Sequence, residues 1–251
     1  MIETESIQRM AADVALRAQA EDLFAKLCHY RYSYHFDWMS RPIVQFPQDV
    51  FAMQEIVWST RPDLIIETGI AHGGSLVFSA SMLALLDYCD AAANGSTVDP
   101  RRPARTVLGV DIDIRAHNRA SIEAHPMASR IRMIQGSSID PAIIAKVHEA
   151  ARGKASVLVV LDSNHTHEHV LAELEAYAPL VSAGSYCIVF DTVVEHLPKE
   201  LFPDRPWGPG DNPKTAVHEW LRRHPEFEID RQVADKLLLT VAPDGYLRRT
   251  R

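Results

Sequence analysis

The sequence predicts an α/β protein in which helices cover both faces of a mostly parallel sheet. Its 251 residues can bury one large core, and a composition of 47% hydrophobic and 24% charged residues is ordinary for a globular protein. From about residue 64 onward, short β-rich runs alternate with segments of helical character. This alternation is typical of a doubly wound sheet.

Charge and cysteine content argue against several other classes. The net charge is −7 and the chain has no basic run, so we expect no nucleic-acid partner. Cys28, Cys89 and Cys187 have no CxxC spacing, which indicates neither a zinc site nor a disulfide framework. The acidic, polar N-terminus lacks the features of a signal peptide, and no apolar run approaches the roughly 20 residues of a membrane helix. We therefore expect a cytoplasmic protein that does not insert into a membrane.

Residues 1–60 are predicted to form an N-terminal helical and aromatic cap, and residues 61–251 the domain that holds the sheet. Within the cap, residues 5–29 show an apolar stripe that changes sides midway, so this helix should bend, split or be buried broadly. An aromatic-rich segment follows, and residues 47–59 predict a further helix. The apolar and aromatic character of the cap predicts contacts between copies of the chain, and hence a homo-oligomer.

Seven runs are predicted to be strands, and most of the first five are apolar nearly throughout, as expected of strands buried on both faces. The runs are 64–68, 107–112, 131–135, 157–161, 186–190, 227–233 and 237–241, with helices expected near 75–89, 115–125, 141–151, 168–178 and 213–223. Only three residues separate the last two runs, so these should form an antiparallel hairpin. Five parallel strands followed by an antiparallel pair are typical of the Rossmann-like class I methyltransferase fold.

A long irregular loop is predicted between the fifth strand and the last helix. Residues 193–213 contain five prolines, and a loop of this length in a compact domain is often functional. Arg205 and Trp207 in this loop could line a site for an acceptor molecule or could hold the loop in place.

The first buried run ends in a glycine-rich turn, Glu67-Thr68-Gly69-Ile70-Ala71-His72-Gly73-Gly74-Ser75. Gly69 allows a sharp turn, Gly73 lets the backbone approach a ligand closely, and Ser75 can cap the next helix. The spacing matches E-x-G-x-x-x-G, the nucleotide turn of S-adenosylmethionine (SAM) enzymes. Glu67 can receive a methionine ammonium group, whereas it would repel a pyrophosphate. The alternative is a plain strand–helix turn with a surface glutamate.

Polar side chains also follow the second and third strands. Asp111, with Asp113 in reserve, stands where many nucleotide sites bind ribose hydroxyls. Ser137 and Ser138 follow the third strand, where a SAM site would hold the adenine. Because ligands of open α/β sheets bind at the carboxyl ends of the strands, these residues predict one common site. Each could instead be a solvated or helix-capping side chain.

The fourth and fifth strands each end in an acid, Asp162 and Asp191. Neighbouring strands lie roughly 4.8 Å apart, so acids at adjacent strand ends can share a divalent cation. Oxygen ligands with open water positions suit Mg²⁺, and Glu195 and Thr192 could complete the shell. The alternative is a pair of solvated or helix-capping acids.

His165 lies three residues after Asp162, where it could accept the proton of a substrate hydroxyl. It could also be a solvated histidine. A third interpretation combines His165, His167 and an acid into a two-histidine, one-carboxylate iron site, but such a site normally occurs on a β-barrel.

Several stretches resemble the cephalosporin hydroxylase / rhamnosyl O-methyltransferase family, and the likeness covers about residues 30–247. They are residues 41–49, 54–57, 61–75, 161–167 and 202–208. That family is similar to class I SAM-dependent methyltransferases, and its members act on antibiotic precursors and sugar hydroxyls. The resemblance implies a metal held by Asp162 and Asp191 and a base at His165. The predicted cofactor-binding residues are Glu67, Gly69, His72, Gly73, Ser75, Asp111, Ser137, Ser138 and Asp162.

One position departs from the pattern of the family. Metal-dependent relatives tend to carry a Glu-Asp pair at the end of strand five, whereas this chain has Phe190-Asp191. One carboxylate is therefore missing, so either Glu195 replaces it as a ligand or the metal is bound more weakly.

Together, these observations predict a SAM-dependent, Mg²⁺-assisted O-methyltransferase that modifies a hydroxyl of a sugar, glycan or glycosylated metabolite. Two alternatives stay open at this point. One is a metal-dependent hydroxylase of a small metabolite, which requires His165 and His167 to converge. The other is a non-catalytic SAM-binding partner subunit, for which Phe190 is the best support.

Overall fold

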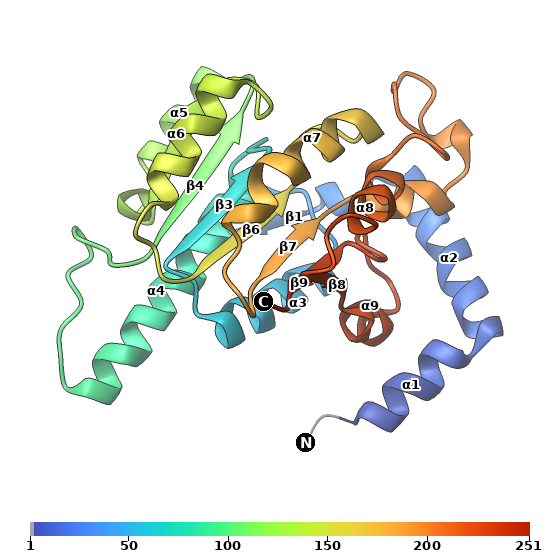
Figure 1. Ribbon diagram of the computed structural model, residues 1–251, viewed down its shortest axis with the longest axis horizontal. Coiled ribbons are helices and arrows are strands. Elements are labelled where there is room, and N and C mark those ends of the chain that lie inside the picture. Colours follow the sequence, from blue (N-terminus) through green and yellow to red (C-terminus); the bar gives the residue numbers. More distant parts are fainter. Residues whose placement is uncertain (1–2) are drawn as a thin grey trace.

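A computed structural model describes residues 3–251 and contains a seven-stranded sheet between two layers of helices (Figure 1). The strand order is β5-β4-β3-β6-β7-β9-β8, and β9 alone runs antiparallel to its neighbours. The strands are β3 (Leu64–Thr68), β4 (Thr106–Asp111), β5 (Ile131–Gln135), β6 (Val157–Leu161), β7 (Tyr186–Val189), β8 (Phe227–Ile229) and β9 (Tyr246–Arg249). This topology confirms the predicted Rossmann-like class I methyltransferase fold.

Side chains of the central strands alternate between two hydrophobic cores, one on each face of the sheet. Ile65 packs in one core, while Leu64 and Ile66 pack in the other. The first core is covered by α3 (Pro47–Thr60), α4 (Gly74–Asn94) and α5 (Ala116–Glu123). The second is covered by α6 (Pro141–Ala151), α7 (His167–Tyr177) and α8 (Pro213–Leu221). Short 3₁₀ turns are η1 (Tyr32–Tyr34), η2 (Ala128–Arg130), η3 (Ala178–Leu180), η4 (Thr192–His196) and η5 (Lys199–Leu201).

The N-terminal helix is split, as the shift of its apolar stripe allows. α1 (Thr4–Ala12) ends at Asp13, whose side chain accepts a hydrogen bond of 2.9 Å from the Leu16 amide and so caps α2 (Val14–His29). α1 has no buried residue and extends away from the sheet (Figure 1). The antiparallel pair β1 (Phe36–Trp38) and β2 (Arg41–Ile43) then leads into α3.

The predicted C-terminal hairpin is wrong in its second strand. Residues 231–237 form α9 (Arg231–Leu237), which the Asp230 side chain caps by accepting from the Gln232 amide at 3.2 Å. β8 pairs with β9, and eight residues separate the end of α9 from the start of β9. The apolar run 237–241 does not continue as a strand because Leu238 has a φ of +60° and the residues after it bond to a buried carboxylate of α3.

α4 is a core helix despite its apolar composition. Within residues 3–251, it is the one helix that is long and apolar enough to cross a membrane by length and composition, and half of its most apolar window is buried inside the fold. Its buried side chains include Leu76, Leu83 and Leu86, which pack against the sheet in the first core.

The far end of α4 is tied to the sheet by a buried ionic cluster. Asp87 pairs with Arg130 at 2.6 Å and also with Arg105, which in turn contacts Asp90 at 2.8 Å. Asp87 is 9% exposed and Arg130 is 4% exposed, so little water reaches this pair. Removal of one partner would leave a buried charge uncompensated.

We predict that Asp87→Asn lowers the free energy of unfolding by about 3 kcal/mol, because Arg130 loses its buried counter-ion. Urea denaturation followed by circular dichroism measures this change. Asp22→Asn is the control, because the Asp22–Lys26 pair is largely exposed and contributes little. Equal stability of both variants would contradict the role given to the buried cluster.

Candidate active site

The carboxyl ends of β3, β4, β6 and β7 border a cleft of about 550 Å³, which is a size typical of small-molecule sites. Residues from widely separated parts of the chain meet in it. They include Tyr34, Gln45, His72, Asp111, Asn118, Asp162, His165, Asp191, Arg205, Trp207 and Val241. The convergence of strand ends predicted from the sequence is therefore present.

The glycine turn is shaped by close backbone approach. Gly69 has a φ of +90°, and a Cβ on it would lie 2.0 Å from the Asp162 carbonyl oxygen. Gly73 has a φ of +84° and faces the Ile122 side chain, while Gly74 faces the Pro42 carbonyl oxygen. Side chains at these three positions would push apart the segments that form the cleft.

Asp111 holds the turn from the neighbouring strand. Its Oδ2 atom accepts hydrogen bonds from the amides of Ile70 at 2.8 Å and Ala71 at 3.3 Å, and its Oδ1 accepts from the amide of Asp113 at 2.9 Å. Asp111 and Asp113 both line the cleft, and Asp113 is the more exposed of the two. The preference for Asp111 over Asp113 as a ligand of ribose hydroxyls stays a prediction.

Two residues that sequence reasoning missed brace the other side of the turn. Arg41 Nε donates to the His72 carbonyl at 3.0 Å, and Asn118 Nδ2 donates to the Ala71 carbonyl at 2.9 Å. Arg41 also donates to Asn118 Oδ1 at 3.2 Å, which joins the two braces. The position of Arg41 in the stretch 41–49 that resembles the family is a signal that points to this site.

Glu67 is buried beneath the turn and is 3% exposed. It accepts a hydrogen bond from the Ser75 hydroxyl. The prediction that Ser75 caps the next helix is therefore wrong, because Gly73 occupies the N-cap position. Burial raises the pKa of Glu67 from its usual 4.5 to about 7, while the Ser75 hydrogen bond opposes this shift. A buried acid of this kind favours a cationic partner such as an ammonium group.

The two serines after β5 do not line the cleft. Ser138 is 5% exposed, its hydroxyl lies 3.0 Å from His169 Nε2, and its carbonyl accepts from the Tyr177 hydroxyl. The Ser137 carbonyl accepts a turn hydrogen bond from the Asp140 amide at 3.0 Å. Contact of either serine with a cofactor therefore stays a prediction.

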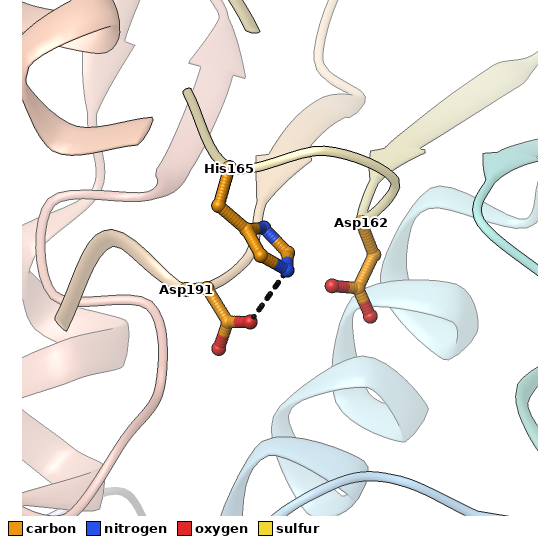
Figure 2. Close-up of side chains that lie close together, drawn as sticks. All are labelled: Asp162, His165 and Asp191. Carbon is orange, nitrogen blue, oxygen red and sulfur yellow. Dashed lines mark ion pairs between the residues drawn. The ribbon is translucent and has the colours of Figure 1, made fainter. Parts of the chain in front are cut away.

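Asp162, His165 and Asp191 form a three-residue cluster at the ends of β6 and β7 (Figure 2). One ligand atom from each lies within 4.8 Å of the others, and His165 Nε2 lies 3.1 Å from Asp191 Oδ2. Asp191 has a φ of +56°, a conformation rarely adopted by residues other than glycine. The sequence therefore placed both acids correctly at adjacent strand ends, and the fold adds the imidazole to them.

The electrostatics of this cluster fit a divalent cation. Burial and then the nearby carboxylates of Asp191 and Glu67 raise the pKa of Asp162 well above its usual range. Within residues 3–251, no lysine or arginine forms an ion pair with Asp162 or Asp191. Gln45 Nε2 donates to Asp162 Oδ2 at 3.3 Å, and the buried Gln45 Oε1 has no hydrogen-bond partner. Oxygen-rich sites of this kind suit Mg²⁺ or a similar ion.

Two predicted additions to the metal shell lie elsewhere. The Glu195 carboxylate accepts from the Gly210 amide at 2.8 Å and from Asn212 Nδ2, so it fastens the base of the loop 193–213. The Thr192 hydroxyl is buried and donates to the Pro243 carbonyl at 2.7 Å. Glu195 is not part of the three-residue cluster, and the Thr192 hydroxyl is engaged by the Pro243 carbonyl.

The two-histidine iron site does not form. His167 Nε2 lies 3.2 Å from the Glu219 carboxylate and its Nδ1 lies 2.8 Å from the Thr215 hydroxyl, so it faces α8. It is not part of the cluster that holds His165. His165 has a different neighbour, since its ring meets the Trp207 ring edge-on with centroids 4.9 Å apart.

The long loop provides one wall of the cleft. The Arg205 guanidinium lies 5.0 Å from the centre of the Trp207 ring, and both residues line the cleft. Through its contact with His165, Trp207 joins this wall to the three-residue cluster. Of the two possibilities for Arg205 and Trp207, the structure therefore supports a place at the cleft.

The titration of Glu67 yields a test of the site. The pKa of Glu67 is higher in the folded protein than in the unfolded chain. Its favourable contribution to the free energy of unfolding is therefore present below about pH 4.5 and is lost as the pH rises through about 7. We predict that Glu67→Gln, measured by urea denaturation, gains stability over the wild type by up to about 3 kcal/mol between pH 5 and pH 8. A difference that does not change with pH would contradict the burial argument.

The strand order, the E-x-G-x-x-x-G turn and the acids at the strand ends define a class I SAM-dependent methyltransferase. The family model "Rhamnosyl O-methyltransferase/CmcI" matches residues 30–250, so the chain belongs to this family. This result confirms the resemblance noted from the sequence.

Curated relatives agree with this assignment. The rhamnosyl O-methyltransferase of Mycobacterium tuberculosis (strain ATCC 25618 / H37Rv) is 30% identical over 203 residues, which cover 80% of this chain and 73% of that protein. The rhamnosyl O-methyltransferase of Mycobacterium leprae (strain TN) is 28% identical over 214 residues, covering 84% and 82%.

Solved structures support the fold. A structure of CmcI with Mg and SAM is 18% identical, covers 87% of this chain and 78% of its own, and has a TM-score of 0.56. The O-methyltransferase from Bacillus cereus in complex with SAH is 14% identical, covers 91% and 90%, and has a TM-score of 0.52.

Proposed function

We propose that this protein transfers the methyl group of SAM to a hydroxyl of a sugar, a glycan or a glycosylated metabolite with the help of Mg²⁺. The observation that carries the proposal is the cluster of Asp162, His165 and Asp191 beside the glycine turn in one cleft. Membership of a family whose curated members are named rhamnosyl O-methyltransferases supports the choice of acceptor.

The residues around the cleft fit both groups. Glu67 does not line the cleft itself; it lines the small neighbouring cavity with Asp162, where its buried carboxylate would receive the ammonium end of SAM. Asp111 stands at the cleft where ribose hydroxyls would lie. Asp162 and Asp191 would hold the cation. When bound, SAM supplies the methyl group, and the cation supplies positive charge that favours an ionised acceptor hydroxyl.

His165 is the proposed proton acceptor. Its Nε2 atom faces the space between the two carboxylates (Figure 2), and Asp191 at 3.1 Å would stabilise the protonated imidazole. The Trp207 ring restricts the orientation of the imidazole and shields it from water on one side. The cleft walls orient the acceptor hydroxyl toward the methyl group, and this positioning would supply much of the rate.

A cytoplasmic location and a homo-oligomer are also proposed. The cytoplasmic location and the homo-oligomer expected from the sequence stay predictions. Exposed Phe51 and Trp58 on α3, with Leu85 and Tyr88 on α4, support contacts between copies of the chain, because large apolar groups on a surface favour burial.

The first test is calorimetric titration of the purified protein with SAM, with and without Mg²⁺. Binding in the micromolar range would support the proposal and would direct the search to sugar acceptors. No binding in either condition would overturn it.

We predict that Asp162→Ala lowers turnover by at least about 100-fold, because a cation ligand is lost, and that it changes SAM affinity little. Methyl transfer from radiolabelled SAM and calorimetry measure the two effects. Asp37→Ala is the control, because Asp37 is an exposed acid outside the cleft. Unchanged turnover in Asp162→Ala would exclude the metal role.

The two histidines of the loop give a second, matched comparison. We predict that His165→Asn lowers turnover by roughly 100-fold, the usual effect of losing a general base, whereas His167→Asn keeps most of it. Initial rates at saturating SAM and Mg²⁺ measure both. Equal losses in the two variants would contradict the assignment of His165.

A further inference from the structure

The stretch that runs from the end of β2 into the first turn of α3 borders the cation cluster. It contains Gln45 and Asp49, which are 7% and 0% exposed although both are polar. Together with Asp162 and Phe190, these two side chains line a small cavity of about 20 Å³. Buried polar groups are costly unless they make specific hydrogen bonds, so the contacts of both residues indicate what they do.

Asp49 receives three hydrogen bonds from the C-terminal part of the chain. Its Oδ1 accepts from the Tyr246 hydroxyl at 2.7 Å and from the Thr240 hydroxyl, and its Oδ2 accepts from the Val241 amide at 3.0 Å. All three partners are donors in this arrangement, and only a carboxylate accepts at both of its ends. An asparagine could keep the bond from the Val241 amide through its oxygen, but its amide group would then require the Tyr246 and Thr240 hydroxyls to accept instead of donate.

The loop that Asp49 holds in turn supports Asp191. The Val241 carbonyl accepts from the Val193 amide at 3.1 Å, and the Pro243 carbonyl accepts from the Thr192 hydroxyl at 2.7 Å. These two bonds fix the residues that follow Asp191, whose φ of +56° is unfavourable unless its surroundings impose it.

Gln45 contacts the other carboxylate of the cluster. Its Nε2 donates to Asp162 Oδ2 at 3.3 Å, which orients that carboxylate from below. The same short segment therefore reaches Asp162 directly and Asp191 through the loop 240–243.

We propose that Gln45 and Asp49 are positioning residues of the cation site, which together set the placement of the Asp162 and Asp191 carboxylates. The inference rests on the proposed function, because it assumes that these carboxylates bind a divalent cation. The N-terminal segment would then help to form the cation site, in addition to capping the domain. Residues that orient metal ligands commonly change metal affinity by 10–100-fold.

The test compares Asp49→Asn with Asp87→Asn, a variant that also loses a buried carboxylate, but outside the cleft. Calorimetry gives the Kd of Mg²⁺ at saturating SAM and the Kd of SAM without Mg²⁺. We expect Asp49→Asn to weaken Mg²⁺ binding at least 10-fold and SAM binding less than about twofold. Asp87→Asn should lose stability and keep both affinities.

A second pair of variants guards against misfolding of Asp49→Asn. Gln45→Ala should weaken Mg²⁺ binding by roughly 10-fold, whereas Gln48→Ala, three residues away in sequence and without a contact to the cluster, should leave it unchanged. Circular dichroism and the Tm report whether each variant is folded.

The outcomes separate the two proposals. If the wild type binds SAM and Mg²⁺ and the folded Gln45 and Asp49 variants bind Mg²⁺ as tightly, the positioning role is wrong and the proposed function stands. If either variant weakens SAM and Mg²⁺ equally, its effect is structural and the positioning role is also wrong. If the wild type binds no Mg²⁺, both proposals fail.

Discussion

The close approach of β3 and β6 at their carboxyl ends is the constraint on which the site depends. Gly69 passes so near the Asp162 backbone that a Cβ on it would lie 2.0 Å from the carbonyl oxygen. This single backbone contact therefore places the glycine turn, which would face SAM, beside Asp162, which would hold a cation. Asp111 and Arg41 hold that turn from two sides, so hydrogen bonds from two other parts of the chain maintain the contact.

An excess of negative charge surrounds this contact. Glu67 and Asp49 are buried, and burial raises the pKa of each, to about 7 and about 6. Asp162 experiences the field of both, together with that of Asp191. Such a group of acids is costly without positive charge, and the same repulsion favours binding of a cation or an ammonium group. The electrostatic repulsion among these acids therefore favours the binding of positively charged groups.

Predictions from the sequence were correct where neighbouring residues determine the structure, and wrong where residues far apart in the chain determine it. β6 spans residues 157–161 as predicted, because five consecutive apolar residues can be buried on both faces. The run 237–241 misled the prediction, since a short apolar run does not distinguish strand from helix or loop. Its conformation is decided by the bonds from Thr240 and Val241 to Asp49, a residue nearly 200 positions away.

The sequence by itself determined the fold class, the glycine turn and the two acids at adjacent strand ends, because the period of the strands and the parallel topology bring those positions to one edge of the sheet. Tertiary structure alone decided which side chains join them. It decided that His165 and not His167 joins the acids, fastened Glu195 to the loop 193–213, and placed Gln45 beside Asp162 and Asp49 beside the loop 240–243. Such contacts depend on how distant segments pack, and local sequence patterns carry no information about that packing.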